Sequence, residues 1–172
     1  GWRPNQAWVS DITFIRTGEG WLYLAAILDL ASRRIVGWSM SERINADLVC
    51  QTLRSACWQR KPPPGLLLHS DRGAQYASRA YRKLTAAFKI SVSMSRRANA
   101  WNNAPMESFF KTLKVERIYQ NHYETRAHAR LATTKRAPMP AWISSIGSRA
   151  ITIGNACIPR STSLPLSTTR PA

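Results

Sequence analysis

The chain is poor in acidic residues, with only nine Asp and Glu against 25 Lys and Arg among its 172 residues. The resulting formal net charge of +16 favours a polyanionic partner, most simply nucleic acid. An anionic membrane surface is the weaker alternative. A surplus of Lys and Arg can also serve solubility alone, but a surplus of this size favours the interpretation as a DNA-binding or RNA-binding protein.

Long apolar runs and paired cysteines are also lacking. No stretch approaches the roughly 20 apolar residues that a membrane-spanning helix needs, so we expect no membrane partner. The three cysteines and three histidines form no zinc-finger spacing. Cys50 and Cys57 share one face of a helical pattern, so we expect both to be buried in a reduced, cytoplasmic protein. The chain starts at Gly1 without a signal peptide, so we expect a fragment of a longer protein.

A hydrophobic content of 44% and seven Trp indicate a globular chain that fits one domain with an appendage. Residue patterns predict strands at 7–15, 21–30, 34–41, 66–71 and 90–95, and helices at 46–60, 77–88 and 104–119. Tight turns make the first three strands an antiparallel meander. The order predicts an α/β fold with a mixed five-stranded sheet, in which parallel strands follow the meander and helices flank it.

The last part of the chain differs in composition. Segment 131–172 has no Asp or Glu, and 17 of its 42 residues are Ser, Thr or Pro. This composition disfavours a packed element, so we divide the chain into a core at 1–130 and an irregular basic tail at 131–172. Shifted codons over 132–160 permit an amphipathic peptide that regains acids. One hypothesis is therefore that the tail is translated out of frame; a genuine basic tail is the alternative.

Three carboxylates are candidates for chemistry. Asp11 lies within a strand, where a charge is costly unless it is paired or binds metal. Asp71 ends a buried strand, where α/β sheets place ligands. Glu107 begins a helix, and 35 residues separate it from Asp71. Each acid alone is explained by a turn, a cap or a helix dipole worth about 0.3–1 kcal/mol. Together they suit two Mg²⁺ or Mn²⁺ ions about 4 Å apart, which catalyse phosphoryl transfer.

The blocks around these acids are WVSDITFI, LHSDRGAQYAS and SMSRRANAWNNAPMESFFKTLKVE. Over residues 4–130 they resemble the catalytic core of DDE transposases and retroviral integrases, and more narrowly the second-frame transposases of bacterial insertion sequences. The resemblance implies an RNase H-like fold in which catalytic Asp11, Asp71 and Glu107 hold two divalent metal ions, Mg²⁺ or Mn²⁺. It also implies cleavage at element ends and strand transfer into target DNA.

By the same resemblance we expect a bacterial, cytoplasmic and nucleoid-associated protein that forms a homo-oligomer on DNA. The family's upstream helix-turn-helix is absent from this sequence. Arginines and an amide near the acids suit phosphate or base contacts, two lysines at i+4 and i+7 from Glu107 suit terminal phosphates, and a tryptophan suits base stacking. These DNA-binding candidates are Arg72, Gln75, Arg96, Arg97, Trp101, Lys111 and Lys114. A solvated helix face explains the lysines equally well, and a buried hinge explains Trp101 equally well.

The block before Glu107 departs from the family pattern. The chain has Ala98, Ala100 and Asn102 where the family usually has glycine, cysteine and aspartate. Two alternatives to an active transposase therefore stay open: a catalytically inactive DNA-binding remnant and an RNase H-like nuclease. Asp29 and Glu116 are the nearest rival acids, and we expect a structural role for the first and pairing with Lys or Arg for the second.

Overall fold

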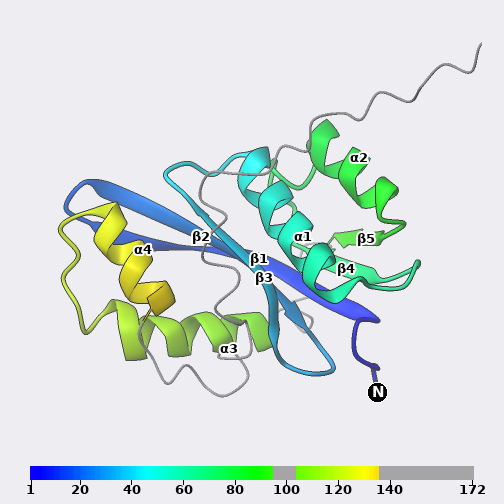
Figure 1. Cartoon of the computed structure of the whole chain (residues 1–172), viewed down its shortest axis with the longest axis horizontal. Helices are drawn as coiled ribbons and strands as arrows, with labels where there is room; N and C mark the ends of the chain where they lie inside the picture. The colour runs from blue at the N-terminus through cyan, green and yellow to red at the C-terminus, as the bar shows by residue number, and fades with distance from the viewer. Residues whose placement is uncertain (95–103, 136–172) are drawn as a thin grey trace, which may run out of the picture.

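The computed structural model describes residues 1–94 and 104–135 (Figure 1). In chain order its elements are β1 (Ala7–Thr17), β2 (Gly20–Asp29), β3 (Ile35–Ser41), α1 (Ala46–Arg60), β4 (Leu67–Ser70), α2 (Arg79–Ala87), β5 (Ser91–Met94), α3 (Ala104–Leu113), the π-helical turn η2 (Lys114–Ile118) and α4 (Arg126–Lys135). Among the described residues, no helix is long and apolar enough to cross a membrane.

The sheet has five strands in the order β3-β2-β1-β4-β5. Strands β1, β2 and β3 pair antiparallel, whereas β4 pairs parallel with β1, and β5 pairs parallel with β4. The mixed five-stranded sheet predicted from the sequence is therefore confirmed. At the turn after β2, the buried Asp29 carboxylate accepts hydrogen bonds from Ser32 Oγ at 2.7 Å and Ala31 N at 3.2 Å, which gives this acid the structural role expected for it.

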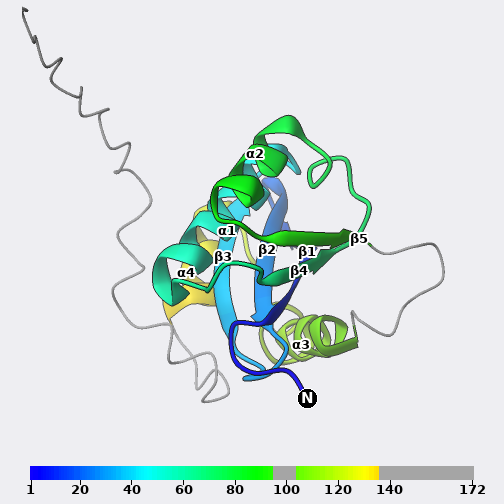
Figure 2. The ribbon, with the colours of Figure 1, turned by 90° about the vertical axis from the view of Figure 1, so that its right-hand side faces the viewer.

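Two hydrophobic cores cover the two faces of the sheet. Helices α1 and α2 lie on one face and α3 lies on the other (Figures 1 and 2). Phe109 and Phe110 are buried in the core beneath α3. Cys50 and Cys57 are buried beneath α1 as free thiols, as their helical spacing predicts.

The helix predicted at 104–119 has an irregular second half. Regular α-helix ends at Leu113, and the chain then makes a π-helical turn in which Tyr119 N donates to Lys114 O at 2.8 Å. This hydrogen bond joins residues five positions apart instead of four, so the last turn of the helix is wider than a regular α-helical turn.

Helix α4 was not predicted. It begins where Thr125 Oγ1 accepts a hydrogen bond from His128 N at 3.0 Å, and Ala129 is fully buried against the α3 side of the sheet. Its inner face is made of small Ala and Thr side chains, which give a weak sequence signal. The helix extends to Lys135, past the expected core boundary at 130; the remaining tail residues, 136–172, lie outside the described residues.

Candidate active site

Asp11 and Asp71 lie on neighbouring strands. The parallel pairing of β1 with β4 ends at Ser10 opposite Ser70. Asp11 is the next residue after Ser10, and Asp71 is the next residue after Ser70, so the two acids follow the same rung of the sheet. Backbones of paired strands run about 4.8 Å apart. Asp11 is half-buried and Asp71 is exposed, so the pair opens to solvent at the carboxyl end of β4.

Short local hydrogen bonds orient both carboxylates. Asp11 Oδ1 accepts from Ile12 N at 2.8 Å, and Asp71 Oδ1 accepts from Gly73 N at 3.1 Å. The second bond belongs to the turn by which the chain leaves β4. These bonds turn each side chain back toward its own backbone and limit the rotamers that it can adopt.

A buried tyrosine contacts β1 at the residue before Asp11. Tyr76 is fully buried, and its hydroxyl lies 3.0 Å from Ser10 Oγ. Burial is the largest cause that raises the pKa of Tyr76 well above its ordinary value, and the charges of Tyr81, Asp11 and Asp71 add to it. The Tyr76 hydroxyl therefore stays neutral in the folded protein and lies within electrostatic reach of both acids. The sequence did not indicate that Tyr76 contacts Ser10 beside the acids, although Tyr76 lies in the block around Asp71.

Glu107 lies in the first turn of α3 and is exposed. Val9 and Ile15 of β1 pack in the same core as Met106 and Phe110 of α3. Because alternate residues of a strand point to the same face, Asp11 is directed to the face of the sheet that α3 covers. Glu107 and Asp11 are thus on the same side of the sheet.

The described residues contain no group of three or more His, Cys, Asp or Glu side chains that could hold a metal ion. The structure thus places Asp11 beside Asp71 and Glu107 on the same side of the sheet, without gathering the three into one ligand set. The donor chemistry nevertheless fits a hard divalent cation, because carboxylate oxygens are the ligands that Mg²⁺ and Mn²⁺ prefer.

His69 is buried in β4, two residues before Asp71. Burial lowers its pKa, so the ring is neutral at pH 7. Its Nδ1 lies 3.3 Å from Ser93 Oγ, which joins β4 to β5. The geometry gives His69 a structural role beside the acids.

Four of the seven candidate DNA contacts lie among the described residues. Arg72 and Lys111 are exposed, and Gln75 is half-buried. Lys114 is half-buried, with its Nζ 4.7 Å from the centroid of the Phe14 ring, so its ammonium is directed toward β1. The remaining candidates, Arg96, Arg97 and Trp101, lie outside the described residues.

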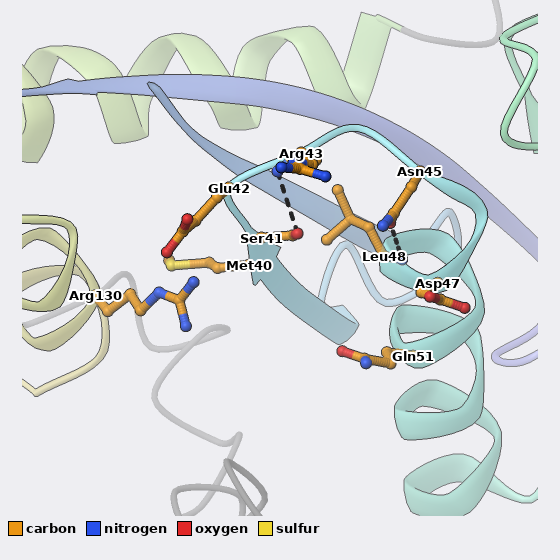
Figure 3. A pocket seen from close by; sticks show the side chains of 9 residues that line it. All are labelled: Met40, Ser41, Glu42, Arg43, Asn45, Asp47, Leu48, Gln51 and Arg130. Carbon is orange, nitrogen blue, oxygen red and sulfur yellow. Dashed lines mark hydrogen bonds between the residues drawn. The ribbon is translucent and has the colours of Figure 1, made fainter. Parts of the chain in front are cut away.

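A pocket of about 450 Å³ lies away from these acids, between the end of β3, the start of α1 and α4 (Figure 3). Asn45 and Ser41 accept backbone hydrogen bonds within it, and Glu42 is paired with Arg126 at 3.3 Å. Its lining carries both signs of charge, and none of the three candidate carboxylates lines it. The three candidate carboxylates therefore lie outside this pocket.

Comparison with protein families and curated proteins gives consistent matches. A model of the integrase core domain family matches residues 2–100. Transposase InsF for insertion sequence IS3A of Escherichia coli is 48% identical over 123 residues, which cover 72% of this chain and 43% of that protein. The transposase for insertion sequence element IS904 of Lactococcus lactis is 49% identical over 126 residues, which cover 73% and 50%. The chain thus spans half or less of the length of these relatives.

Solved structures with similar folds include retroviral integrases. A chain of the simian T-cell lymphotropic virus intasome in complex with PP2A regulatory subunit B56 gamma gives a TM-score of 0.62 at 17% identity, over 99% of this chain and 62% of that chain. The catalytic core domain of BIV integrase gives 0.58 at 20% identity, over 77% and 86%. The HTLV-2 integrase catalytic core domain in complex with magnesium gives 0.55 at 18% identity, over 67% and 70%. These likenesses concern the fold, and they confirm the expected RNase H-like architecture.

Proposed function

The chain belongs to the integrase core domain family, and from this premise we propose that it is the catalytic core of an insertion-sequence transposase. Its reaction would be cleavage of DNA at element ends, followed by strand transfer into target DNA. One observation carries the proposal: Asp11 and Asp71 come directly after the last paired residues of β1 and β4, and Glu107 is on the side of the sheet to which Asp11 points.

In this proposal Asp11, Asp71 and Glu107 are the catalytic residues and would hold two divalent metal ions, Mg²⁺ or Mn²⁺. The chemistry that such ions would supply there is activation of water or of a DNA 3′-hydroxyl and charge stabilisation of the leaving 3′-oxygen. The chain itself supplies the anionic ligands and their orientation. Ile12 N and Gly73 N hold the two strand acids, and the buried residues of α3 fix the helix that carries Glu107.

The surface charge supports a DNA partner. Arg72 follows Asp71 directly, and Lys111 lies one helical turn after Glu107, so both exposed cations flank the acids where phosphates of a bound strand would lie. We propose that Gln75 and Lys114 add to this contact, as do Arg96, Arg97 and Trp101, which lie outside the described residues. A homo-oligomer on DNA and association with the bacterial nucleoid belong to the same proposal.

The test is a Mn²⁺-dependent strand-transfer assay with oligonucleotides that carry the ends of IS3 and IS904, the elements of the two relatives. We expect transfer by the wild-type chain and a loss of at least 100-fold in Glu107→Gln, because removal of one metal ligand removes most of the charge stabilisation of the transition state. Glu116→Gln is the matched control, since Glu116 is an exposed acid in the next part of the same element.

The outcomes separate the alternatives. Transfer that survives Glu107→Gln contradicts the assignment of this glutamate. DNA binding without transfer in any variant supports a catalytically inactive remnant, to which the substitutions Ala98, Ala100 and Asn102 already point. Cleavage of RNA–DNA hybrids without strand transfer supports an RNase H-like nuclease.

We further propose that the family-like sequence ends near residue 130, within α4 (Arg126–Lys135), and that segment 131–172 is an out-of-frame translation. Its lack of any Asp or Glu supports this. In the shifted frame the genetic code already forces Ala from Met139 with Pro140 and Asp from Trp142 with Ile143. The nucleotide sequence tests the rest: its codons over 132–160 must spell the amphipathic, acid-containing peptide. A shifted frame that is interrupted by stop codons over 132–160 contradicts it.

A further inference from the structure

An exposed aromatic pair lies at the outer end of the β1–β2 hairpin, the end beside α4 (Figure 1). The side chains of Phe14 and Trp21 are 51% and 45% exposed. Their ring centroids are 5.0 Å apart with an interplanar angle of 81°. Edge-to-face pairing of this kind fixes both rings, so the pair presents a preformed apolar surface to solvent.

Cations frame this aromatic pair. Lys114 Nζ lies 4.7 Å from the centroid of the Phe14 ring. Arg16 is exposed and pairs directly opposite Trp21 in the hairpin, so the two side chains share a face. Since Lys114 already lies over the Phe14 ring, we take Trp21 as the ring that receives a base.

The backbone beneath Trp21 is held by helix α4. Arg126 Nε donates to Trp21 O at 3.2 Å, and Arg126 N donates to Glu19 Oε2 at 2.9 Å. The guanidinium also pairs with Glu42 at 3.3 Å. These contacts join the hairpin turn, the end of β3 and α4, so Trp21 is part of a braced element and not of a free loop.

Two elements lead from the candidate carboxylates to this pair. Phe14 is three residues after Asp11 on β1, which corresponds to about 10 Å of strand. This odd spacing directs the Phe14 ring to the opposite face of the sheet from Asp11. The pairing of β1 with β4 ends at Ser10, so a DNA strand can pass from one face to the other around this edge of β1. Lys114 is seven residues after Glu107, which corresponds to about 10 Å of helix. A strand end at the carboxylates would cover this distance in about three nucleotides at ~3.4 Å each.

We propose that Trp21, supported by Phe14, is a stacking site for an unpaired base of the DNA strand whose end lies at the carboxylates, with Arg16 and Lys114 at its phosphates. The proposal rests on the proposed function. Aromatic rings bind any base through its π-face, and adjacent cations bind the backbone. The net charge of +16 and the cations around the rings favour a nucleic acid over an apolar protein or lipid partner.

The experiment measures DNA binding by the full 172-residue chain in EDTA, with fluorescence anisotropy at fixed salt. Two labelled probes share one duplex: the first is blunt and the second carries an overhang of four unpaired thymidines. We expect Trp21→Ala to weaken binding to the overhang probe at least about fivefold, the loss of one base–aromatic stack, and to leave blunt binding unchanged. An overhang of abasic sites should remove the preference of the wild-type chain.

Matched variants separate stacking from folding and from charge. Trp58→Ala is the control, because Trp58 is 81% exposed on α1 and should not affect either probe. Trp21→Leu keeps an apolar side chain without the ring and should behave as Trp21→Ala, whereas Trp21→Phe should retain most of the preference. The logarithm of the DNA association constant falls linearly as the logarithm of the salt concentration rises, and Lys114→Gln should make this dependence less steep by about 0.7–1.

The proposal is overturned when folded Trp21→Leu binds the overhang probe as tightly as the wild type, or when it weakens both probes equally. The assay needs no metal and no transfer, so it is independent of the proposed chemistry. Glu107→Gln should keep the overhang preference while it loses transfer. A chain in which Glu107→Gln retains transfer would contradict the proposed function and leave the stacking result readable.

Discussion

The hydroxyl of Tyr76 lies 3.0 Å from Ser10 Oγ, although 66 positions separate the two residues in the sequence. Ser10 directly precedes Asp11, and Tyr76 closes the turn that begins at Gly73, two residues after Asp71. Both partners are buried. This hydrogen bond therefore joins the strand that carries one candidate acid to the loop that carries the other, and it positions the two acids relative to each other.

Tyr76→Phe tests this link. The change leaves Ser10 Oγ without its partner in a buried place, so we expect a loss of about 1–2 kcal/mol in the free energy of unfolding, measured by urea denaturation. The Mn²⁺ concentration at half-maximal strand transfer should also rise, because the two acids are less firmly placed. Tyr119→Phe, at a side chain that is 72% exposed, is the control; equal effects of the two variants would contradict the link.

Metal binding should raise the thermal stability of the folded chain. A ligand that binds only the folded state at 100 times its Kd contributes about 2.7 kcal/mol, so we expect a higher Tm with Mn²⁺ or Mg²⁺, measured by differential scanning fluorimetry. Asp71→Asn should lose most of this shift because it removes an anionic oxygen ligand, and Glu116→Gln should keep it. An unchanged shift in Asp71→Asn would place the bound ions elsewhere.

Gly37→Ala should destabilise the contact between β3 and α1. A Cβ at this position would lie 2.7 Å from Thr52 O and 2.7 Å from Ala56 Cβ, so strand and helix must move apart. Overpacking of this kind typically costs about 1–3 kcal/mol. Urea denaturation measures the loss, and Gly1→Ala, where nothing lies within 4 Å, should show none. A Gly37→Ala chain as stable as the wild type would mean that α1 can shift freely on the sheet.

Alkaline pH should destabilise the fold because it favours ionisation of buried cysteine thiols and tyrosine hydroxyls. Burial raises the pKa of the Cys57 thiol from 9.0 to about 12, and burial likewise raises the pKa of Tyr81. Because the folded state holds these protons more tightly than the unfolded state, the stabilisation is fully present below pH 9 and is lost as the pH rises toward 12. Urea denaturation between pH 8 and pH 11 under reducing conditions measures the slope.

Cys57→Ala should flatten this slope although it lowers stability at pH 8 by opening a small cavity. Tyr119→Phe should not change it, since Tyr119 is exposed. An unaltered slope in Cys57→Ala would assign the alkaline loss to the other buried groups whose pKa is raised, Cys50, Tyr76 and Tyr81.

Local patterns were sufficient for most elements. The short, apolar, β-branched run over 7–15 and the helical spacing over 46–60 predicted β1 and α1 with little error at their ends. Local sequence patterns did not predict α4, because Arg126 in this helix bonds to Glu19 and Trp21, which lie more than 100 positions earlier in the sequence. The sequence did not predict the π-helical turn after Leu113, because its residues include no glycine or proline that would indicate a break in the helix.

The sequence by itself determined the element order, the sign of the surface charge and the three acids at their family spacing. These properties follow from residue type and from periodicities of two or 3.6 residues, which need no partner in space. Only the tertiary structure decided that Asp11 neighbours Asp71, that Tyr76 reaches Ser10, and that Lys114 lies over Phe14. Such pairs depend on strand register and helix packing, which are set by the burial of the whole core and not by any local segment.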